Sequence, residues 1–282
     1  MDIKATEKVL KLRDYSVSGE TFELYLDTEL ELLKTNPQPQ GEDLNRYYES
    51  EDYISHTDSK RNWFEKAYQI VKGITIQSKV KLIEGFSLNG KTILDIGCGT
   101  GDFLVGAKKV GWKTLGLEPN YKACEIAKSK GVSIVENLEL IDSNSVDLIT
   151  MWHVLEHIPD LNSQIIAIKR VLKKDGILLI AVPNYKSYDA KYYKSFWAAY
   201  DVPRHLWHFS QTSIKLLFEK YQFSLDNKYP MWFDSFYVSL LSEKYKNGKS
   251  NVLKAFWIGL KSNMKARKTT EFSSIIYKLR KN

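Results

Sequence analysis

Short β-branched runs alternate with segments of helical periodicity from residue 91 to residue 183. The runs are KTILDIG, KTLGLE, VSIVE, VDLITM and GILLIAVP. Strands that alternate with helices are joined by right-handed crossovers, which place the strands parallel in one sheet with helices on both faces. The pattern therefore predicts an α/β fold built on a doubly wound, mostly parallel sheet.

The segments on either side of this core carry other signals. Residues 12–27 alternate polar and apolar residues around the triplet SGE, which predicts a hairpin, and Pro37 and Pro39 predict a linker after it. The final residues alternate like an edge strand, so we expect them to join the sheet as a late antiparallel partner. We divide the chain into a hairpin with its linker (1–40), N-terminal helices (41–87), the α/β core (88–230), a helical insert or lid (231–271) and the final strand (272–282).

Composition excludes several classes of protein. The 282 residues are 43% hydrophobic and 27% charged, which is typical of a globular chain and not of a disordered or collagen-like one. The only two cysteines, Cys98 and Cys124, cannot build a disulfide framework. The N-terminus lacks an apolar signal segment, and no run approaches the ~18 apolar residues of a membrane span. We therefore expect a cytoplasmic protein with no transmembrane segment.

The net charge of +7 is distributed unevenly. Acidic residues outnumber basic ones in residues 1–60, whereas residues 242–282 are strongly basic. A basic excess can attract nucleic acid or anionic lipid, but no nucleic-acid motif accompanies this one. A solvated helix face is the first interpretation, weak association with a membrane surface is a second, and nucleic acid is not expected as a partner.

The sequence LDIGCGTGDF joins the first core strand to the next helix. Glycines are needed where a chain turns tightly and lets a ligand touch its backbone beside a helix N-terminus. A glycine triplet alone is a weak signal, because ordinary strand-to-helix turns also use it. A dinucleotide fingerprint would need a third glycine at Asp102, where an acid would repel a pyrophosphate. Asp95, two residues before the first glycine, instead suits a ligand that carries positive charge.

A second acid ends the neighbouring strand, in the sequence LGLEPN. Glu118 would then lie at the carboxyl edge of the sheet, where a carboxylate can accept hydrogen bonds from both hydroxyls of a ribose. The two motifs together predict a nucleoside ligand whose other end is positively charged.

These motifs resemble those of class I S-adenosylmethionine-dependent methyltransferases, and the likeness extends through VDLITMWHVLEHIPD and GILLIAVPN, over about residues 88–185. The resemblance implies a Rossmann-like, seven-stranded sheet and S-adenosylmethionine as the cofactor. It also implies the residues that bind this cofactor: Asp95, Gly97, Cys98, Gly99 and Gly101 in the loop, Glu118 and Pro119 at the ribose, Asn137 and Leu138 beside the adenine, and Met151 and Trp152 against the cofactor.

The function that the resemblance implies is methyl transfer to a small-molecule acceptor, such as a sugar, a quinol or another metabolite. Such an enzyme aligns donor and acceptor and removes a proton where the acceptor carries one. Two alternatives stay open: a domain that binds S-adenosylmethionine without turnover, and a nicotinamide-dependent reductase, which Asp102 disfavours.

The histidines are grouped in three places: His56; His153 and His157; His205 and His208. The run HVLEH follows VDLITM, where the strand end would border both cofactor and acceptor, so His153 is the first candidate for a catalytic base. The run also matches a zinc-protease pattern, but Pro159 follows too soon for the long helix that such a site needs.

The same run is similar to the ExxEH sequence with which metal-assisted quinone O-methyltransferases bind a divalent ion. His153 stands where those enzymes have the first acid. We therefore assign no metal, and leave open whether Glu156 and His157 bind one.

The third group lies in DVPRHLWHFS, residues 201–210. Arg204 can bind a phosphate or carboxylate of an acceptor, and His205 or His208 can exchange a proton near neutral pH. Arg204, His205 and His208 are therefore catalytic candidates beside His153, and similar RHLxHF runs occur in methyltransferases of small molecules. The structural alternative is a turn with an Arg–Asp pair and stacked aromatic rings.

Two peripheral regions stay ambiguous. Relatives often begin with a zinc ribbon in which CxxC pairs flank a hairpin, but residues 27–30 are DTEL here. The hairpin is thus either a ribbon that has lost its metal or an unrelated element. The insert 231–271 is interpreted as helices packed on the core, as a lid over the acceptor, or as a membrane-surface helix.

Overall fold

The computed structural model describes residues 4, 6–48 and 63–282. The strands are β1 (Glu7–Arg13), β2 (Thr21–Asp27), β3 (Leu32–Asn36), β4 (Thr92–Ile96), β5 (Lys113–Leu117), β6 (Ser133–Val135), β7 (Val146–Trp152), β8 (Leu172–Pro183), β9 (Trp207–His208), β10 (Phe223–Pro230) and β11 (Ser274–Lys281). The α-helices are α1 (Glu42–Asn45), α3 (Trp63–Glu84), α4 (Asp102–Lys109), α5 (Tyr121–Ser129), α6 (Leu161–Val171), α7 (Tyr188–Tyr193), α8 (Gln211–Glu219), α9 (Asp234–Asn247) and α10 (Val252–Thr269). Short 3₁₀ turns are η1 (Arg46–Tyr48), η2 (Leu138–Leu140), η3 (Leu155–His157), η4 (Lys194–Phe196) and η5 (Ala198–Tyr200).

The larger sheet has seven strands in the order β10-β11-β8-β7-β4-β5-β6. Strands β4 to β8 run parallel, whereas β11 is antiparallel to both of its neighbours. This confirms the predicted α/β fold and its mostly parallel sheet. The chain builds outward from β4 to β6 and then returns to β7 on the other side of β4. Ligands of such sheets bind in the crevice at this reversal, outside the carboxyl ends of the strands.

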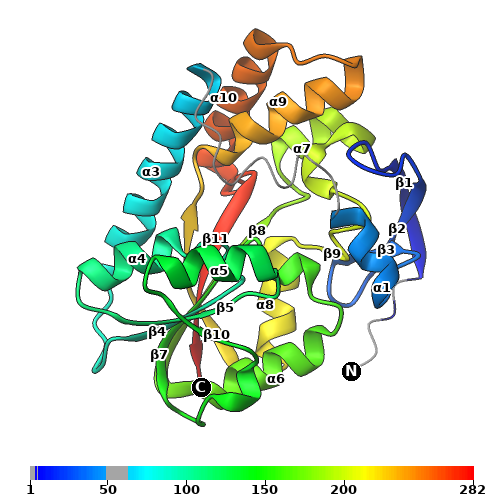
Figure 1. The fold of residues 1–282 in the computed structure, drawn as a ribbon. Coiled ribbons are helices and arrows are strands. Elements are labelled where there is room, and N and C mark those ends of the chain that lie inside the picture. Colours follow the sequence, from blue (N-terminus) through cyan, green and yellow to red (C-terminus); the bar gives the residue numbers. More distant parts are fainter. Residues whose placement is uncertain (1–3, 5, 49–62) are drawn as a thin grey trace.

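Alternating residues of the central strands fill two separate cores. Ile93 of β4 packs with apolar residues of α3, α4 and α5, whereas its neighbour Leu94 packs with those of α6 and α8. Because successive side chains of a strand point to opposite faces, uninterrupted apolar runs are what a sheet covered on both faces requires. Figure 1 shows the helices on both faces of the sheet.

The prediction of an antiparallel final strand is confirmed, but its expected place at the sheet edge is wrong. Strand β11 lies between β8 and β10, and β10 is the edge. The first four residues of β11 are buried, and Tyr277 is fully so. Strand β11 is therefore an internal strand, paired on both sides, and is not the half-exposed edge strand that its sequence predicts.

A second, smaller sheet forms from the N-terminal hairpin. Strands β1 and β2 pair antiparallel as predicted, while β3, which the sequence analysis did not predict, extends the hairpin. The two-residue strand β9 completes this sheet by pairing with β3. Residues after β8 are thereby fixed against the N-terminal region (Figure 1).

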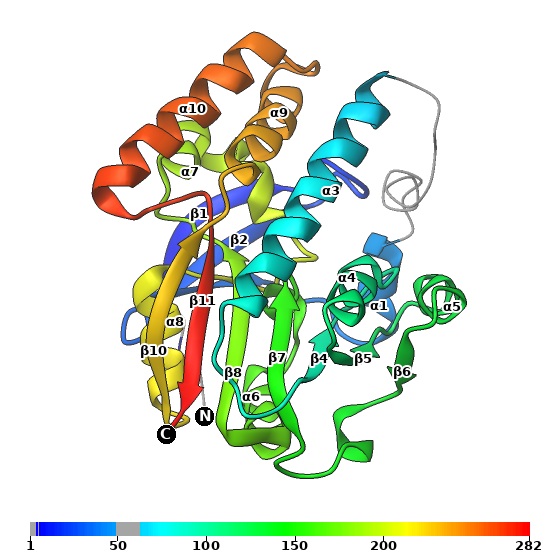
Figure 2. The ribbon, with the colours of Figure 1, turned by 90° about the vertical axis from the view of Figure 1, so that its left-hand side faces the viewer.

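The carboxyl ends of the parallel strands face the end of the molecule from which α3, α9 and α10 project (Figure 2). Helices α9 and α10 form the helical part of the predicted insert 231–271. Of the predicted N-terminal helical region 41–87, residues 49–62 lie outside the described residues, and α3 supplies its last helix. The region boundaries stay predictions.

Candidate functional site

The glycine loop between β4 and α4 has a backbone that only glycine adopts readily. Gly97, Gly99 and Gly101 have φ angles of 71°, 52° and 77°, in the left-handed region that costs other residues strain. A Cβ atom at Gly97 would lie 2.4 Å from Cγ2 of Val154, but one at Gly99 would meet no atom within 4 Å. The loop is therefore tightly packed at its first glycine and open at its second.

A carboxylate stands beside the open glycine. Oε2 of Glu118 accepts a hydrogen bond of 2.8 Å from the backbone N–H of Gly99, and Oε1 accepts one of 2.9 Å from that of Asn120. These bonds fix the carboxylate at the carboxyl end of β5, and each oxygen keeps a second lone pair. The residues fit the ribose of S-adenosylmethionine, because its hydroxyls are donors and Gly99 leaves room for close approach.

Two of the expected loop residues lie inside the molecule. Asp95 is 2% exposed and accepts a hydrogen bond of 2.6 Å from Oγ1 of Thr150, and burial raises the pKa of Asp95 to about 7. Cys98 is also buried, and burial raises the pKa of its thiol. Its sulfur lies where a side chain at Gly116 would have to go, 2.6 Å from a Cβ there. Cys98 is thus a packing residue of the loop.

The remaining expected cofactor residues are spread along the same edge. The Asn137 side chain caps η2 by accepting a bond of 3.1 Å from Leu140 N–H, and Leu138 is buried. Met151 is fully buried, whereas Trp152, the last residue of β7, is half-buried and Pro119 is exposed.

Asp102 does not carry the free charge that the sequence analysis assumed. It forms ion pairs with Lys72 at 2.7 Å and Lys130 at 2.6 Å. Burial opposes ionisation of Asp102, but these two lysines hold its pKa below the usual range. The pairing weakens the argument that Asp102 would repel a pyrophosphate.

Lys79 of α3 is a site residue that the sequence analysis missed. Its Nζ lies 4.2 Å from the ring centroid of Trp152. Burial lowers the pKa of Lys79 to about 8, against the opposing effect of the nearby carboxylates of Asp95 and Asp234. A lysine with such a pKa exists partly as the neutral amine near physiological pH and can accept a proton.

His153 is held between two carboxylates. Its Nδ1 is 3.3 Å from Oε1 of Glu156, and its Nε2 is 3.1 Å from Oδ2 of Asp234, the first residue of α9. Burial alone would lower the pKa of His153, but the hydrogen bonds to both carboxylates raise it to about 9. The imidazole is therefore protonated at neutral pH, and this geometry disfavours His153 as a base.

The RHLxHF run is the structural turn that the sequence analysis kept as its alternative. Arg204 is 5% exposed and forms an ion pair with Asp201. It also donates bonds of 2.9 Å to the Tyr47 carbonyl and 2.5 Å to Oγ of Ser16. The guanidinium is thus committed to the protein, a geometry that disfavours Arg204 as a residue that binds an acceptor.

His208 is equally committed to the protein. It is 4% exposed, and its Nε2 lies 2.9 Å from Oγ1 of Thr35 on β3. Burial lowers the pKa of His208 well below the usual value. His208 therefore fastens β9 to β3 within the smaller sheet, and its buried position disfavours the expected role as a proton acceptor.

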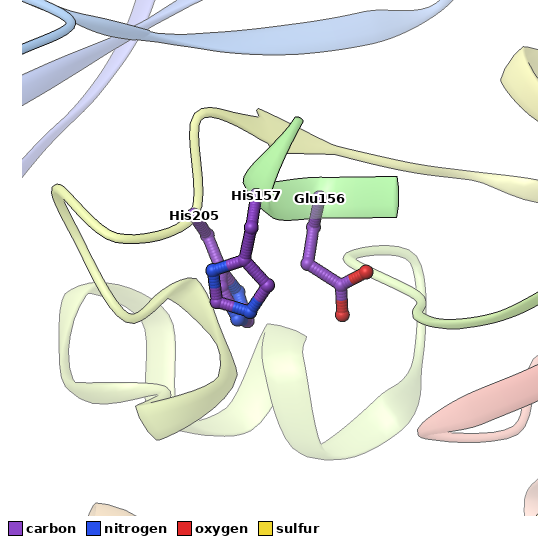
Figure 3. Close-up of side chains that lie close together, drawn as sticks. All are labelled: Glu156, His157 and His205. Atoms are coloured by element: carbon purple, nitrogen blue, oxygen red, sulfur yellow. The ribbon is translucent and has the colours of Figure 1, made fainter. Parts of the chain in front are cut away.

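His205 lies elsewhere than expected, close to the HVLEH run. Figure 3 shows its ring beside His157 and Glu156, and the centroids of the two imidazole rings are 4.6 Å apart. Burial and the neighbouring His205 lower the pKa of His157 to about 4. The structure thus brings together two histidine groups that the sequence analysis treated separately, while His56 lies outside the described residues.

Comparisons with known proteins agree with this layout. The profile of a family described as "Methyltransferase domain" matches residues 53–228. The ubiquinone biosynthesis O-methyltransferase of Haemophilus ducreyi is 32% identical over 111 residues, which are 34% of this chain and 47% of that protein. That of Bordetella avium is 30% identical over 108 residues, or 35% and 45%. The chain spans about half the length of these curated relatives.

Two solved structures share the fold over most of the chain. Magnesium protoporphyrin IX methyltransferase from Synechocystis, with bound S-adenosylhomocysteine, has a TM-score of 0.54 at 15% identity and covers 84% of this chain and 97% of its own. Geranyl diphosphate C-methyltransferase from Streptomyces coelicolor has a TM-score of 0.54 at 14% identity, with 80% and 88% covered. Among the helices of the described residues, none is long and apolar enough to cross a membrane.

Proposed function

Because this chain belongs to the class I S-adenosylmethionine-dependent methyltransferases, we propose that it transfers the methyl group of that cofactor to a small-molecule acceptor. One observation carries the proposal: the open Gly99 and the fixed Glu118 carboxylate lie together at the carboxyl ends of β4 and β5, beside the point where the sheet order reverses. The Glu118 carboxylate can accept hydrogen bonds from the hydroxyls of a ribose, and the open Gly99 lets a ligand approach the loop backbone closely.

The residues of the loop would hold the cofactor as follows. Glu118 accepts the ribose hydroxyls, the positive φ angles of the glycines keep side chains away from the ligand, and Asn137 and Leu138 flank the adenine. When bound, S-adenosylmethionine supplies a sulfonium methyl group that is already activated for displacement. The protein then contributes mainly alignment of the acceptor and removal of its proton.

We infer that Lys79, in place of His153, accepts that proton. Its amine lies beside Trp152 at the carboxyl end of β7, and burial lowers its pKa, which favours the neutral amine that can accept a proton. His153 instead positions the insert, because its bond to Asp234 ties the first turn of α9 to the end of β7.

The class of acceptor is inferred from the relatives and from the insert. The similar proteins carry names that refer to ubiquinone biosynthesis, magnesium protoporphyrin IX and geranyl diphosphate, all of them small organic molecules. In this chain, α9 follows the exposed aromatic residues Trp232 and Phe233. These features support a small organic acceptor under a lid that residues 231–271 form.

Replacing Glu118 with alanine should weaken S-adenosylhomocysteine binding by about 1–3 kcal/mol, or ~5- to 150-fold. The ribose hydroxyls lose their acceptor, while the loop keeps its glycines. Isothermal calorimetry measures the change. Glu125→Ala on α5 is the matched control, because Glu125 forms only an exposed pair with Lys128; equal affinities in all three proteins would remove the ribose assignment.

Turnover is tested separately from binding. Incubation of the protein with S-adenosylmethionine and panels of quinols, sugars and other metabolites, with detection of S-adenosylhomocysteine, should reveal an acceptor. Cofactor binding with no product from any panel would favour the domain that binds without catalysis.

A further inference from the structure

We propose that Glu156, His157 and His205 form a binding site for one divalent transition-metal ion. Each of these residues offers one ligand atom, and the three atoms lie within 4.8 Å of one another. Figure 3 shows the carboxylate and the two imidazoles converging from η3 and from the segment before β9. Three side chains from two segments far apart in the sequence thus face one point.

Both imidazoles are held in the tautomer that a metal ligand needs. Nδ1 of His157 lies 3.0 Å from the carbonyl oxygen of Arg204, and Nδ1 of His205 lies 2.9 Å from that of Ala199. A carbonyl only accepts, so each Nδ1 carries the proton and each Nε2 keeps its lone pair. The Tyr48 hydroxyl, 3.0 Å from Nδ1 of His157, can act as a second acceptor. Histidine ligands of metals are oriented by such outer partners.

The carboxylate supplies an atom that needs a partner. Glu156 is 1% exposed, and Oε1 faces Nδ1 of His153 at 3.3 Å. Within the described residues, Oε2 is buried and has no hydrogen-bond partner. A buried carboxylate oxygen without a partner is costly, and a cation between it and the imidazoles would remove that cost.

The segments that carry the ligands are also fastened to each other. The Glu156 carbonyl accepts a bond of 2.8 Å from the backbone N–H of Leu206, the residue after His205. A further acid, Asp201, has its Oδ2 3.9 Å from Nε2 of His205, and it is already paired with Arg204. The backbone therefore holds the three ligands together without the ion.

The donor set indicates which ion it would take. Two imidazole nitrogens and one carboxylate oxygen suit Zn²⁺, Co²⁺ or Fe²⁺ better than Mg²⁺ or Ca²⁺, which prefer oxygen ligands. Three protein ligands leave a position for water or another small ligand. The HVLEH run alone predicts no metal, because His153 stands in place of the first acid and His205 lies far away in the sequence.

Cobalt binding tests the proposal without relying on activity. Untagged protein is stripped with chelator and titrated with Co²⁺, followed by visible absorption, and Zn²⁺ is then added as a competitor. One Co²⁺ should bind per chain and Zn²⁺ should displace it. His205→Ala and Glu156→Gln should each weaken Co²⁺ binding by at least ~10- to 100-fold, the loss that even an outer partner of a metal ligand causes.

His208→Gln is the matched control, because it keeps a donor toward Thr35 and changes a histidine whose ring centroid is 6.4 Å from that of His205 but which offers none of the three ligand atoms. It should bind Co²⁺ like the unaltered protein, and S-adenosylhomocysteine titration of every variant verifies that the fold is kept. Absence of Co²⁺ binding, or equal binding by His205→Ala and the unaltered protein, would overturn the site. Neither result affects the proposed methyl transfer, because cofactor affinity is measured independently.

Discussion

Lys79→Met should lower kcat at pH 7 by about 10²- to 10⁴-fold, the usual contribution of a general base, once an acceptor is available. The affinity for S-adenosylhomocysteine should change little, since the ribose acceptor Glu118 and the glycine loop are untouched. Steady-state kinetics and calorimetry measure the two effects. The kcat of the unaltered enzyme should also fall as the pH drops through the lowered pKa of Lys79, because Lys79, facing Asp95 and Asp234, then takes up a proton.

Two further variants separate a base from a mere positive charge. Lys79→Arg keeps the charge but cannot release a proton at neutral pH, so it should be nearly as inactive as Lys79→Met. Lys81→Met, an exposed lysine of the same helix, should behave like the unaltered enzyme. Full activity of Lys79→Arg would show that Lys79 acts only through its charge.

Arg204→Met should destabilise the protein by about 3 kcal/mol, as measured by urea unfolding. Removing one partner of a buried ion pair typically costs 3–5 kcal/mol, and we expect the low end because Asp201 keeps 25% of its side chain exposed. The bonds to the Tyr47 carbonyl and to Ser16 are lost as well. Affinity for S-adenosylhomocysteine should be retained in the folded variant.

The matched control is Arg280→Met near the end of β11. Arg280 is 41% exposed and pairs with Asp226 at 3.0 Å, so its loss should cost only about 0–1 kcal/mol. Equal stability of the Arg204 and Arg280 variants would contradict the structural role of Arg204.

The core of the fold could be predicted because each parallel strand is covered on both faces. The seven residues of β7, VDLITMW, are nearly all buried, and such a run has few alternatives to a central strand. The glycine loop could also be predicted from the sequence, because backbone positions with positive φ angles strongly favour glycine. The position of β11 was missed, since polar residues near its end resemble those of an edge strand.

The missed site residues depend on contacts between distant segments. Lys79 lies on a helix among exposed residues, so nothing in the sequence distinguishes it from a solvated lysine until α3 packs beside Trp152. Asp234 meets His153 only when the insert folds back onto the end of β7. His205, already a candidate, meets His157 only when the turn after β8 folds onto η3. The periodicity of a local sequence does not predict which charged side chains from distant segments will meet in the folded chain.

Calorimetric titration of the unaltered protein with S-adenosylhomocysteine and, separately, with NADH tests the central claim most directly. We predict saturable binding of S-adenosylhomocysteine at one site per chain, reduced in Glu118→Ala, and no binding of NADH. Binding of NADH with no response to S-adenosylhomocysteine would contradict the claim.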